Sequence, residues 1–227
     1  MNNLIKLSKI IDIKFNNDEL FKRVFIHRSY LNEHKGYKGE NNERLEFLGD
    51  AVLELVVTEY LYKNYPNPEG ELTNWRSAIV KGEMLAKIAK KLDIGELMQL
   101  SKGEEKAGGK AKNIILANTF EALIGAIYLD QGYDNAKKMI NMQLLVELQN
   151  IIENKLFVDS KSQLQELIQE KNNVTPIYNV LKEIGPDHNK EFEIGVIVNE
   201  KMIGKGSGSS KQKAEQEAAL DALNKLI

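Results

Sequence analysis

The sequence has no cysteine, only four prolines and a single tryptophan. Without cysteine the chain forms neither disulfides nor thiolate metal sites, which fits a reducing compartment. No apolar run approaches the roughly 18 residues that a membrane-spanning helix needs, and the first residues lack the apolar core of a signal peptide. We therefore expect a cytoplasmic protein without a membrane partner.

There is also little excess of charge of either sign. The 31 Lys and Arg residues and 33 Asp and Glu residues leave a formal net charge of −2. The overall balance gives no indication of a nucleic-acid partner, so any polyanion binding must come from local clusters of basic residues. The length of 227 residues suffices for one large or two modest domains with a proper core.

The most informative stretch is residues 42–54, Asn-Glu-Arg-Leu-Glu-Phe-Leu-Gly-Asp-Ala-Val-Leu-Glu. On a helical wheel its carboxylates share one stripe, whereas apolar residues that include Leu55 are assigned to the opposite side. Carboxylates one turn apart repel each other by about a few tenths of a kcal/mol per pair, and a bound cation relieves this repulsion. Taken alone, the stripe also fits the solvated face of an amphipathic helix. Its members are Glu43, Glu46, Asp50 and Glu54.

A second stretch, residues 114–129, is apolar all round the wheel and predicts a buried helix. Asn118 and Glu121 are three residues apart and therefore share one face. A buried ionised carboxylate needs a cation, a hydrogen-bond network or a proton, and this stretch contains no Lys or Arg. The alternative is that Glu121 is neutral or pairs with a distant Lys or Arg. If the two acidic faces meet, hard oxygen ligands suited to Mg²⁺ or Mn²⁺ come together from Glu46, Asp50, Asn118 and Glu121.

Both stretches resemble known motifs. Residues 42–52 resemble the signature of the ribonuclease III family, and residues 115–125, Ile-Leu-Ala-Asn-Thr-Phe-Glu-Ala-Leu-Ile-Gly, resemble its second acidic motif. The resemblance implies a Mg²⁺-dependent endoribonuclease of RNA processing and decay, in which Mn²⁺ can substitute. Such an enzyme cleaves double-stranded RNA, not DNA, and leaves 5′-phosphates, 3′-hydroxyls and short 3′ overhangs.

The same resemblance implies roles for individual residues. Asp50 and Glu121 are the expected catalytic residues, and both belong to the expected metal ligands Glu46, Asp50, Asn118 and Glu121. Glu43 and Glu69 are second-tier candidates, although Glu69 also fits a solvated loop. Phe47, beside the acidic stripe, is expected in the interface of a homodimer.

Residues 1–153 carry little β signal, so we predict an all-α endonuclease domain. The helices are expected over residues 4–11, 18–31, 42–64, 75–80, 83–100 with a break at Gly95, 114–129 and 133–152, with a further break at Gly132. His27 and Arg28 stand where the family often carries His-Arg-Ser or His-Lys-Ser, and we interpret His27 as structural. The Gly- and Lys-rich residues 101–112 predict a loop that either faces solvent or touches phosphates.

After a linker over residues 154–159, the pattern changes. Residues 160–227 predict a helix, three strands and a second helix, an α-β-β-β-α order that resembles a double-stranded RNA-binding domain. The strands are expected at 177–181, 192–198 and 201–206, with turns at 185–188 and 199–200. An acidic α/β domain that binds protein is the alternative. The RNA-binding candidates are Ser162, Gln165, Glu166, Gln169, His188, Lys211 and Lys213.

Three positions depart from the family pattern. Asn118 stands where Asp is usual, Asn113-Ile114 replaces an acidic-Ser pair, and Lys211-Gln212 replaces two basic residues. Asn118 can still ligate a metal ion through its amide oxygen but carries no charge. The departures leave open a catalytically weak dimer that binds double-stranded RNA, while the intact carboxylates at Glu46, Asp50 and Glu121 favour the enzyme.

Overall fold

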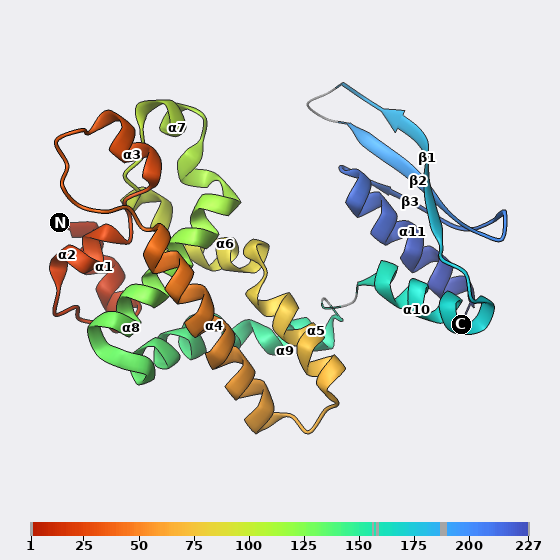
Figure 1. Cartoon of the computed structure of the whole chain (residues 1–227), viewed down its shortest axis with the longest axis horizontal. Helices are drawn as coiled ribbons and strands as arrows, with labels where there is room; N and C mark the ends of the chain where they lie inside the picture. Colours follow the sequence, from red (N-terminus) through yellow and green to blue (C-terminus); the bar gives the residue numbers. More distant parts are fainter. Residues whose placement is uncertain (1, 156, 158, 187–189, 227) are drawn as a thin grey trace. The chain divides into compact units, whose positions relative to one another are not determined.

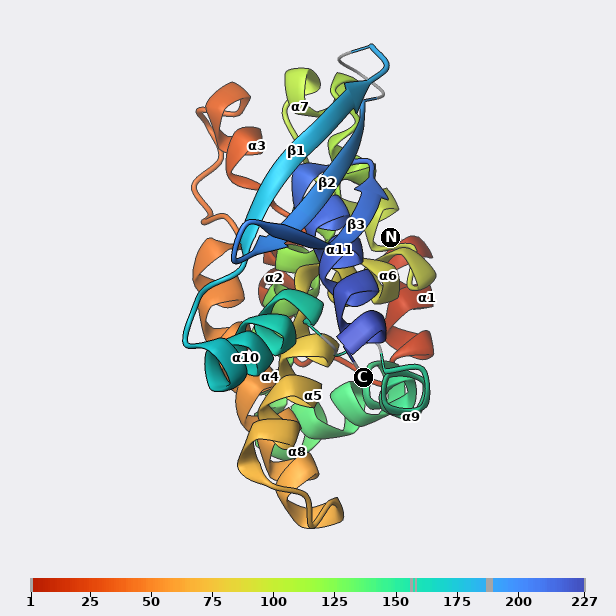
Figure 2. The ribbon, with the colours of Figure 1, turned by 90° about the vertical axis from the view of Figure 1, so that its right-hand side faces the viewer.

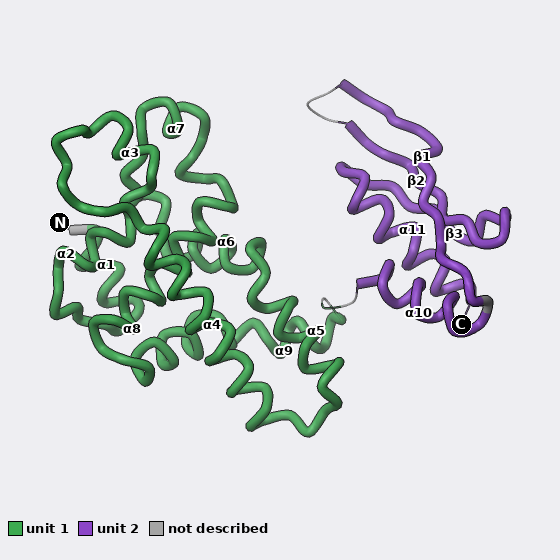
Figure 3. Tube along the Cα trace, viewed as in Figure 1, with its two compact units in different colours: residues 1–157 green, residues 158–227 purple. Residues whose placement is uncertain are grey.

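The structure is a computed structural model that describes residues 2–155, 157, 159–186 and 190–226. The chain divides into two compact units, Met1–Phe157 and Val158–Ile227 (Figure 3). The first is entirely helical in its described part, and the second has the order α-β-β-β-α, so the predicted fold class is confirmed. The exact predicted domain boundaries stay predictions.

The first unit is built around two long helices, α4 and α8 (Figure 1). Both carry large buried side chains, such as Leu53 on α4 and Phe120 on α8. As predicted, the buried helix breaks at Gly132, where φ is 81°. The helices are α1 (Asn2–Ile10), α2 (Asp18–Arg23), α3 (Arg28–Glu33), α4 (Glu43–Asn64), α5 (Glu69–Val80), α6 (Gly82–Lys91), α7 (Lys102–Lys106), α8 (Asn113–Gln143) and α9 (Leu148–Glu153), with 3-10 turns η1 (Ile94–Leu97), η2 (Gly109–Ala111) and η3 (Leu145–Glu147).

Glycines bring the backbones of α4 and α8 into direct contact. A Cβ atom added at Gly49 would lie 1.8 Å from the Glu121 backbone oxygen, and one added at Gly125 would lie 2.2 Å from the Leu45 backbone oxygen. Residues with a side chain would keep helix axes about 8–10 Å apart, so only glycine permits this approach. The crossing fixes Asp50, next to Gly49, beside the segment of α8 that contains Glu121.

Several predicted elements of this unit were wrong. The helix expected over residues 18–31 is split into α2 and α3, because Ile26 and Gln99 form an isolated parallel bridge between them. The helix expected over 83–100 ends at Lys91 and is followed by η1. Residues 101–112 include α7 and η2 instead of a plain loop, and Glu69 begins α5. Tertiary hydrogen bonds outweigh local helix propensity in the first case.

The second unit is a three-stranded antiparallel sheet with strand order β1-β2-β3 and two helices. α11 packs along β2 and β3, and α10 packs on α11 (Figure 2). The core contains Leu164, Ile194, Val196 and Ala218. The turn expected at 185–188 lies partly outside the described residues, and the turn at Asn199 and Glu200 is present, with φ of 48° and 64°. The elements are α10 (Ser160–Asn172), β1 (Ile177–Ile184), β2 (Glu191–Val198), β3 (Lys201–Gly208) and α11 (Lys211–Leu226).

None of the helices in the described part of the chain combines the length and the apolar character that a membrane span requires.

We predict that Gly49→Ala lowers the free energy of unfolding by about 2–3 kcal/mol, because the new methyl group overlaps backbone atoms that cannot turn aside. The control is Gly70→Ala on α5, where an added Cβ meets nothing within 4 Å. That change should raise stability by about 0.5–1 kcal/mol, the helix-propensity difference. Chemical denaturation measures both values, and equal unfolding midpoints would contradict the close crossing.

Candidate metal centre and nucleic-acid interface

The crossing of α4 and α8 brings the predicted acidic residues together. The side chain of Asn118 on α8 lies close enough to the Glu46 carboxyl group on α4 to lower its pKa. Glu121 lies within electrostatic reach of both Asp50 and Glu46. These four residues therefore form one cluster, called here the acidic cluster. Whether they are metal ligands remains a prediction.

The acidic cluster lacks the cations that would neutralise it. Two other carboxylates of α4, which flank the cluster along the helix, do have arginine partners. Glu43 lies 3.7 Å from Arg28, and Glu54 lies 3.1 Å from Arg76. The three carboxylates between them, on Glu46, Asp50 and Glu121, have no Lys, Arg or His partner within 4.0 Å among the residues that the structure describes.

The electrostatic consequence is visible in two pKa values. Burial, with smaller contributions from Asp50 and Glu46, raises the pKa of Glu121 to about 7. Burial also raises the pKa of Glu46, reinforced by Glu43 and Asp50 and opposed by the hydrogen bond from Asn118. A divalent cation bound among these oxygens would favour their charged forms.

The cluster fits a hard cation through its donor chemistry and not through a finished coordination shell. In the described parts of the chain, no group of three or more His, Cys, Asp or Glu side chains is arranged to hold a metal ion. All four donors are nevertheless oxygens, and three are carboxylates, the set that Mg²⁺ and Mn²⁺ prefer.

The two second-tier candidates, Glu43 and Glu69, differ in their contacts. Glu43 is exposed on α4, accepts a hydrogen bond of 3.0 Å from Asn41 and influences Glu46. Glu69, the exposed first residue of α5, makes no hydrogen bond or ion pair with the acidic cluster within the described residues. The structure thus places Glu43 beside the site, and the role of Glu69 stays a prediction.

An exposed apolar stripe runs along α4 beside the site. Phe47 is 82% exposed, as expected for an interface residue, and Leu55 and Tyr62 on the same helix are 57% and 80% exposed. The assignment of Leu55 to the buried side was wrong. Its eight-residue spacing from Phe47 puts it only about 80° round the helix from that ring, a signal that the wheel contained.

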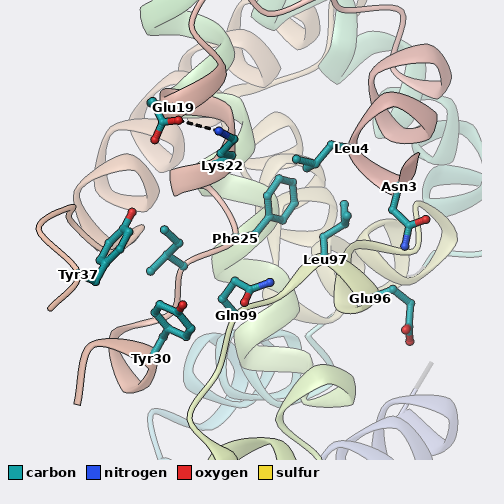
Figure 4. Close-up of a pocket in the computed structure, with 11 residues that line it drawn as sticks. Asn3, Leu4, Glu19, Lys22, Phe25, Tyr30, Tyr37, Glu96, Leu97 and Gln99 are labelled. Carbon is teal, nitrogen blue, oxygen red and sulfur yellow. Dashed lines mark hydrogen bonds and ion pairs between the residues drawn. The ribbon is translucent and has the colours of Figure 1, made fainter. Parts of the chain in front are cut away.

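A shallow hollow of about 510 Å³ lies elsewhere on the first unit (Figure 4). Phe25, Tyr30, Tyr37, Leu97 and Gln99 are among the residues that line it. None of the predicted metal or RNA residues belongs to its lining.

In the second unit, the predicted RNA-binding residues of α10 form one exposed face. Ser162, Gln165, Glu166 and Gln169 are all exposed at spacings of three and four residues. Gln169 donates a hydrogen bond of 3.0 Å to Asn173. His188 lies outside the described residues.

The basic residues at the start of α11 are exposed, but Lys211 has partners. Its Nζ lies 3.1 Å from the Glu183 carboxylate on β1 and 5.5 Å from the centroid of the Phe192 ring. Sequence reasoning missed Glu183, because its contact with Lys211 depends on how β1 and α11 meet in space. An RNA phosphate at Lys211 must therefore compete with Glu183.

Comparison with known proteins supports both units. Residues 17–148 match the Ribonuclease-III-like family model, and residues 160–226 match the double-stranded RNA binding motif. Ribonuclease 3 of Listeria monocytogenes serovar 1/2a is 45% identical over 100% of this chain and 99% of its own length. Ribonuclease 3 of Geobacillus sp. WCH70 is 48% identical over 97% and 90%. The nuclease domain of ribonuclease III from Campylobacter jejuni is 41% identical with a TM-score of 0.58, covering 66% of this chain and 97% of that one.

A helical nuclease domain with an acidic cluster, followed by an RNA-binding domain, defines an endonuclease directed at double-stranded RNA. The chain belongs to the ribonuclease III family, and it is a double-strand-specific endoribonuclease. The alternative of a dimer that binds RNA without cleaving it is therefore set aside, as is that of a protein-binding α/β domain for the second unit.

We predict that Glu183→Gln tightens binding to duplex RNA about two- to fivefold, the size expected when one exposed ion pair no longer competes. Fluorescence anisotropy with a labelled duplex measures the change. Glu217→Gln, which removes the same charge from an exposed position on α11, is the control and should leave binding nearly unchanged. Unaltered or weaker binding by Glu183→Gln would show that Lys211 does not reach the RNA.

Proposed function

We propose that Glu46, Asp50, Asn118 and Glu121 hold Mg²⁺, for which Mn²⁺ can substitute, and that Asp50 and Glu121 are the catalytic carboxylates. The observation that carries this proposal is the group of three neighbouring carboxylates without a cationic partner in the described part of the chain. Burial, reinforced by repulsion from Asp50 and Glu46, raises the pKa of Glu121 to about 7 and makes the site receptive to a divalent ion.

Each residue of the cluster has a distinct task in this proposal. Glu121, half-buried on α8, supplies a negatively charged oxygen from a fixed backbone. Asn118 lowers the pKa of Glu46, so its amide nitrogen acts as the donor and its oxygen remains available to the ion. When bound, the ion supplies an activated water and stabilises charge on the attacked phosphate. The products are 5′-phosphates and 3′-hydroxyls, with short 3′ overhangs, and Glu43 and Glu69 are second-tier groups.

We also propose that the active form is a homodimer. The exposed stripe of Phe47, Leu55 and Tyr62 supports an apolar contact between two copies. The structural report on the Campylobacter jejuni nuclease domain, 42% identical with a TM-score of 0.56, refers to a region involved in dimer formation. Two acidic clusters acting on one duplex would cut both strands. A cytoplasmic location and the lack of action on DNA belong to the same proposal.

In this proposal the second unit provides the main binding surface for the RNA substrate. Ser162, Gln165, Glu166 and Gln169 suit the 2′-hydroxyls of the wide minor groove of A-form RNA. Lys211 and Lys213 suit a phosphate at the start of α11, where backbone N–H groups and the helix dipole add attraction. His188 completes the predicted set.

We predict that Glu121→Gln lowers the cleavage rate at least about a hundredfold, because the amide keeps the volume but loses the charge that holds the ion. Duplex binding should stay within about twofold of wild type. Single-turnover cleavage and anisotropy are the measurements, with Glu83→Gln on the exposed face of α6 as control. Retained cleavage at ordinary Mg²⁺ concentrations would refute the metal site.

We predict that Asn118→Asp shifts the Mg²⁺ titration of activity to about three- to tenfold lower concentration, because Mg²⁺ depends on carboxylate charge. The saturated rate should change much less, and Mn²⁺ should reduce the difference. Without metal, the fourth carboxylate should lower the melting temperature, because the donor to Glu46 is lost and repulsion grows. The control is Asn150→Asp, which adds the same charge at an exposed position on α9. Superimposable titrations would remove residue 118 from the ligand set.

A further inference from the structure

One cation stands at the edge of the acidic cluster without an assigned role. Arg28 is the first residue of α3, and its side chain is 73% exposed. Its guanidinium group lies 3.7 Å from the carboxylate of Glu43. Glu43 in turn acts on Glu46, which belongs to the cluster. Arg28 is therefore connected to the acidic cluster through Glu43.

The backbone that carries Arg28 is held firmly from two sides. His27 caps α3 by accepting a hydrogen bond of 3.2 Å from the Ser29 N–H, and Ser29 Oγ accepts one of 3.0 Å from the Ser101 N–H. The backbone N–H of His27 donates to Gln99 at 3.1 Å, and the N–H of Asn42 donates to Ile26 at 2.9 Å. The start of α3 is thus tied both to the chain before α7 and to the start of α4.

The imidazole of His27, which caps α3, is expected to be neutral. Burial lowers the pKa of His27, and two anions and two cations lie close enough to influence it, Glu104, Glu43, Arg28 and Lys112. Lys112 is engaged with Glu104 at 2.6 Å. Among the described residues, the ion pair of Arg28 within 4.0 Å is the exposed contact with Glu43, and Arg28 also influences Glu104 electrostatically.

The neighbouring Arg44 provides a contrast. Its side chain is 82% exposed on α4, yet it lies 3.6 Å from Glu40, outside the acidic cluster. Arg23 pairs with the same Glu40. Two exposed arginines of equal charge thus lie near the start of α4, and only Arg28 contacts the acidic stripe.

We propose that Arg28 exchanges Glu43 for a backbone phosphate of the RNA strand lying at the acidic cluster, and so positions that strand for cleavage. The planar guanidinium matches the oxygens of a phosphate in a two-pronged contact, which an ammonium group cannot reproduce. The exchange is favourable because an exposed pair at 3.7 Å is weak and is itself screened by salt. This inference rests on the proposed metal site.

The test compares full-length Arg28→Ala, Arg28→Lys and Arg44→Ala with wild type. Cleavage of one duplex RNA at saturating Mg²⁺ gives kcat/KM, and duplex binding in EDTA at several salt concentrations gives the salt slope. Arg28→Ala should lower kcat/KM about ten- to a hundredfold and reduce the salt slope by about 0.9, the loss of one phosphate contact. Arg28→Lys should keep the slope but recover only part of kcat/KM, and Arg44→Ala should stay within about twofold of wild type.

Thermal unfolding of each variant excludes a merely structural effect, and Arg28→Lys preserves the test if Arg28→Ala folds poorly. A wild-type salt slope for Arg28→Ala, together with a kcat/KM equal to that of Arg44→Ala, would overturn the inference. If Arg28→Ala gives this result while Glu121→Gln is inactive in the same assay, only the role of Arg28 is refuted. If Glu121→Gln still cleaves, the metal site itself has failed.

Discussion

The contact between the α4 and α8 backbones at Gly49 and Gly125 is the constraint on which the nuclease domain depends. A Cβ atom at Gly49 would lie 1.8 Å from the backbone oxygen of Glu121, so the two helices meet without intervening side chains. This closeness puts the carboxylates of both helices into one cluster, where burial, with smaller contributions from Asp50 and Glu46, raises the pKa of Glu121 to about 7. The packing that stabilises the core therefore creates an electrostatic cost, and a divalent ion or a proton is what relieves it.

The two units differ in how their charged side chains are paired. The acidic cluster leaves its inner carboxylates without cations in the described residues, whereas the RNA-binding unit holds its cations in weak pairs. Lys211 pairs with Glu183 and lies over the Phe192 ring, and Lys205 lies 3.8 Å from Glu193. Such exposed pairs contribute little to stability and keep the free protein near neutrality, and the proposed RNA contacts require them to exchange for phosphates. This explains how a chain with net charge −2 belongs to a family that acts on RNA.

Sequence periodicity was sufficient to predict the helical and α-β-β-β-α units, the buried helix and the break at Gly132. It also predicted that Glu46 and Asp50 share one helix face and that Asn118 and Glu121 share another, because helical spacing is a local property. It failed where a distant segment decides the outcome. The bridge between Ile26 and Gln99 divides a predicted helix, and the contacts of Lys211 with Glu183 and of Arg28 with Glu43 depend on tertiary packing. The misplacement of Leu55 was different, since its spacing from Phe47 already indicated an exposed position.

The central claim is that one divalent ion binds at the α4–α8 crossing. Anomalous diffraction from crystals of the protein containing Mn²⁺ tests it directly, because the signal locates the ion independently of activity. The account predicts a peak about 2.0–2.3 Å from oxygens of Glu46, Asp50 and Glu121, with Asn118 as the fourth protein ligand. A fully occupied Mn²⁺ site elsewhere in the nuclease domain, with no peak among these oxygens, would contradict it.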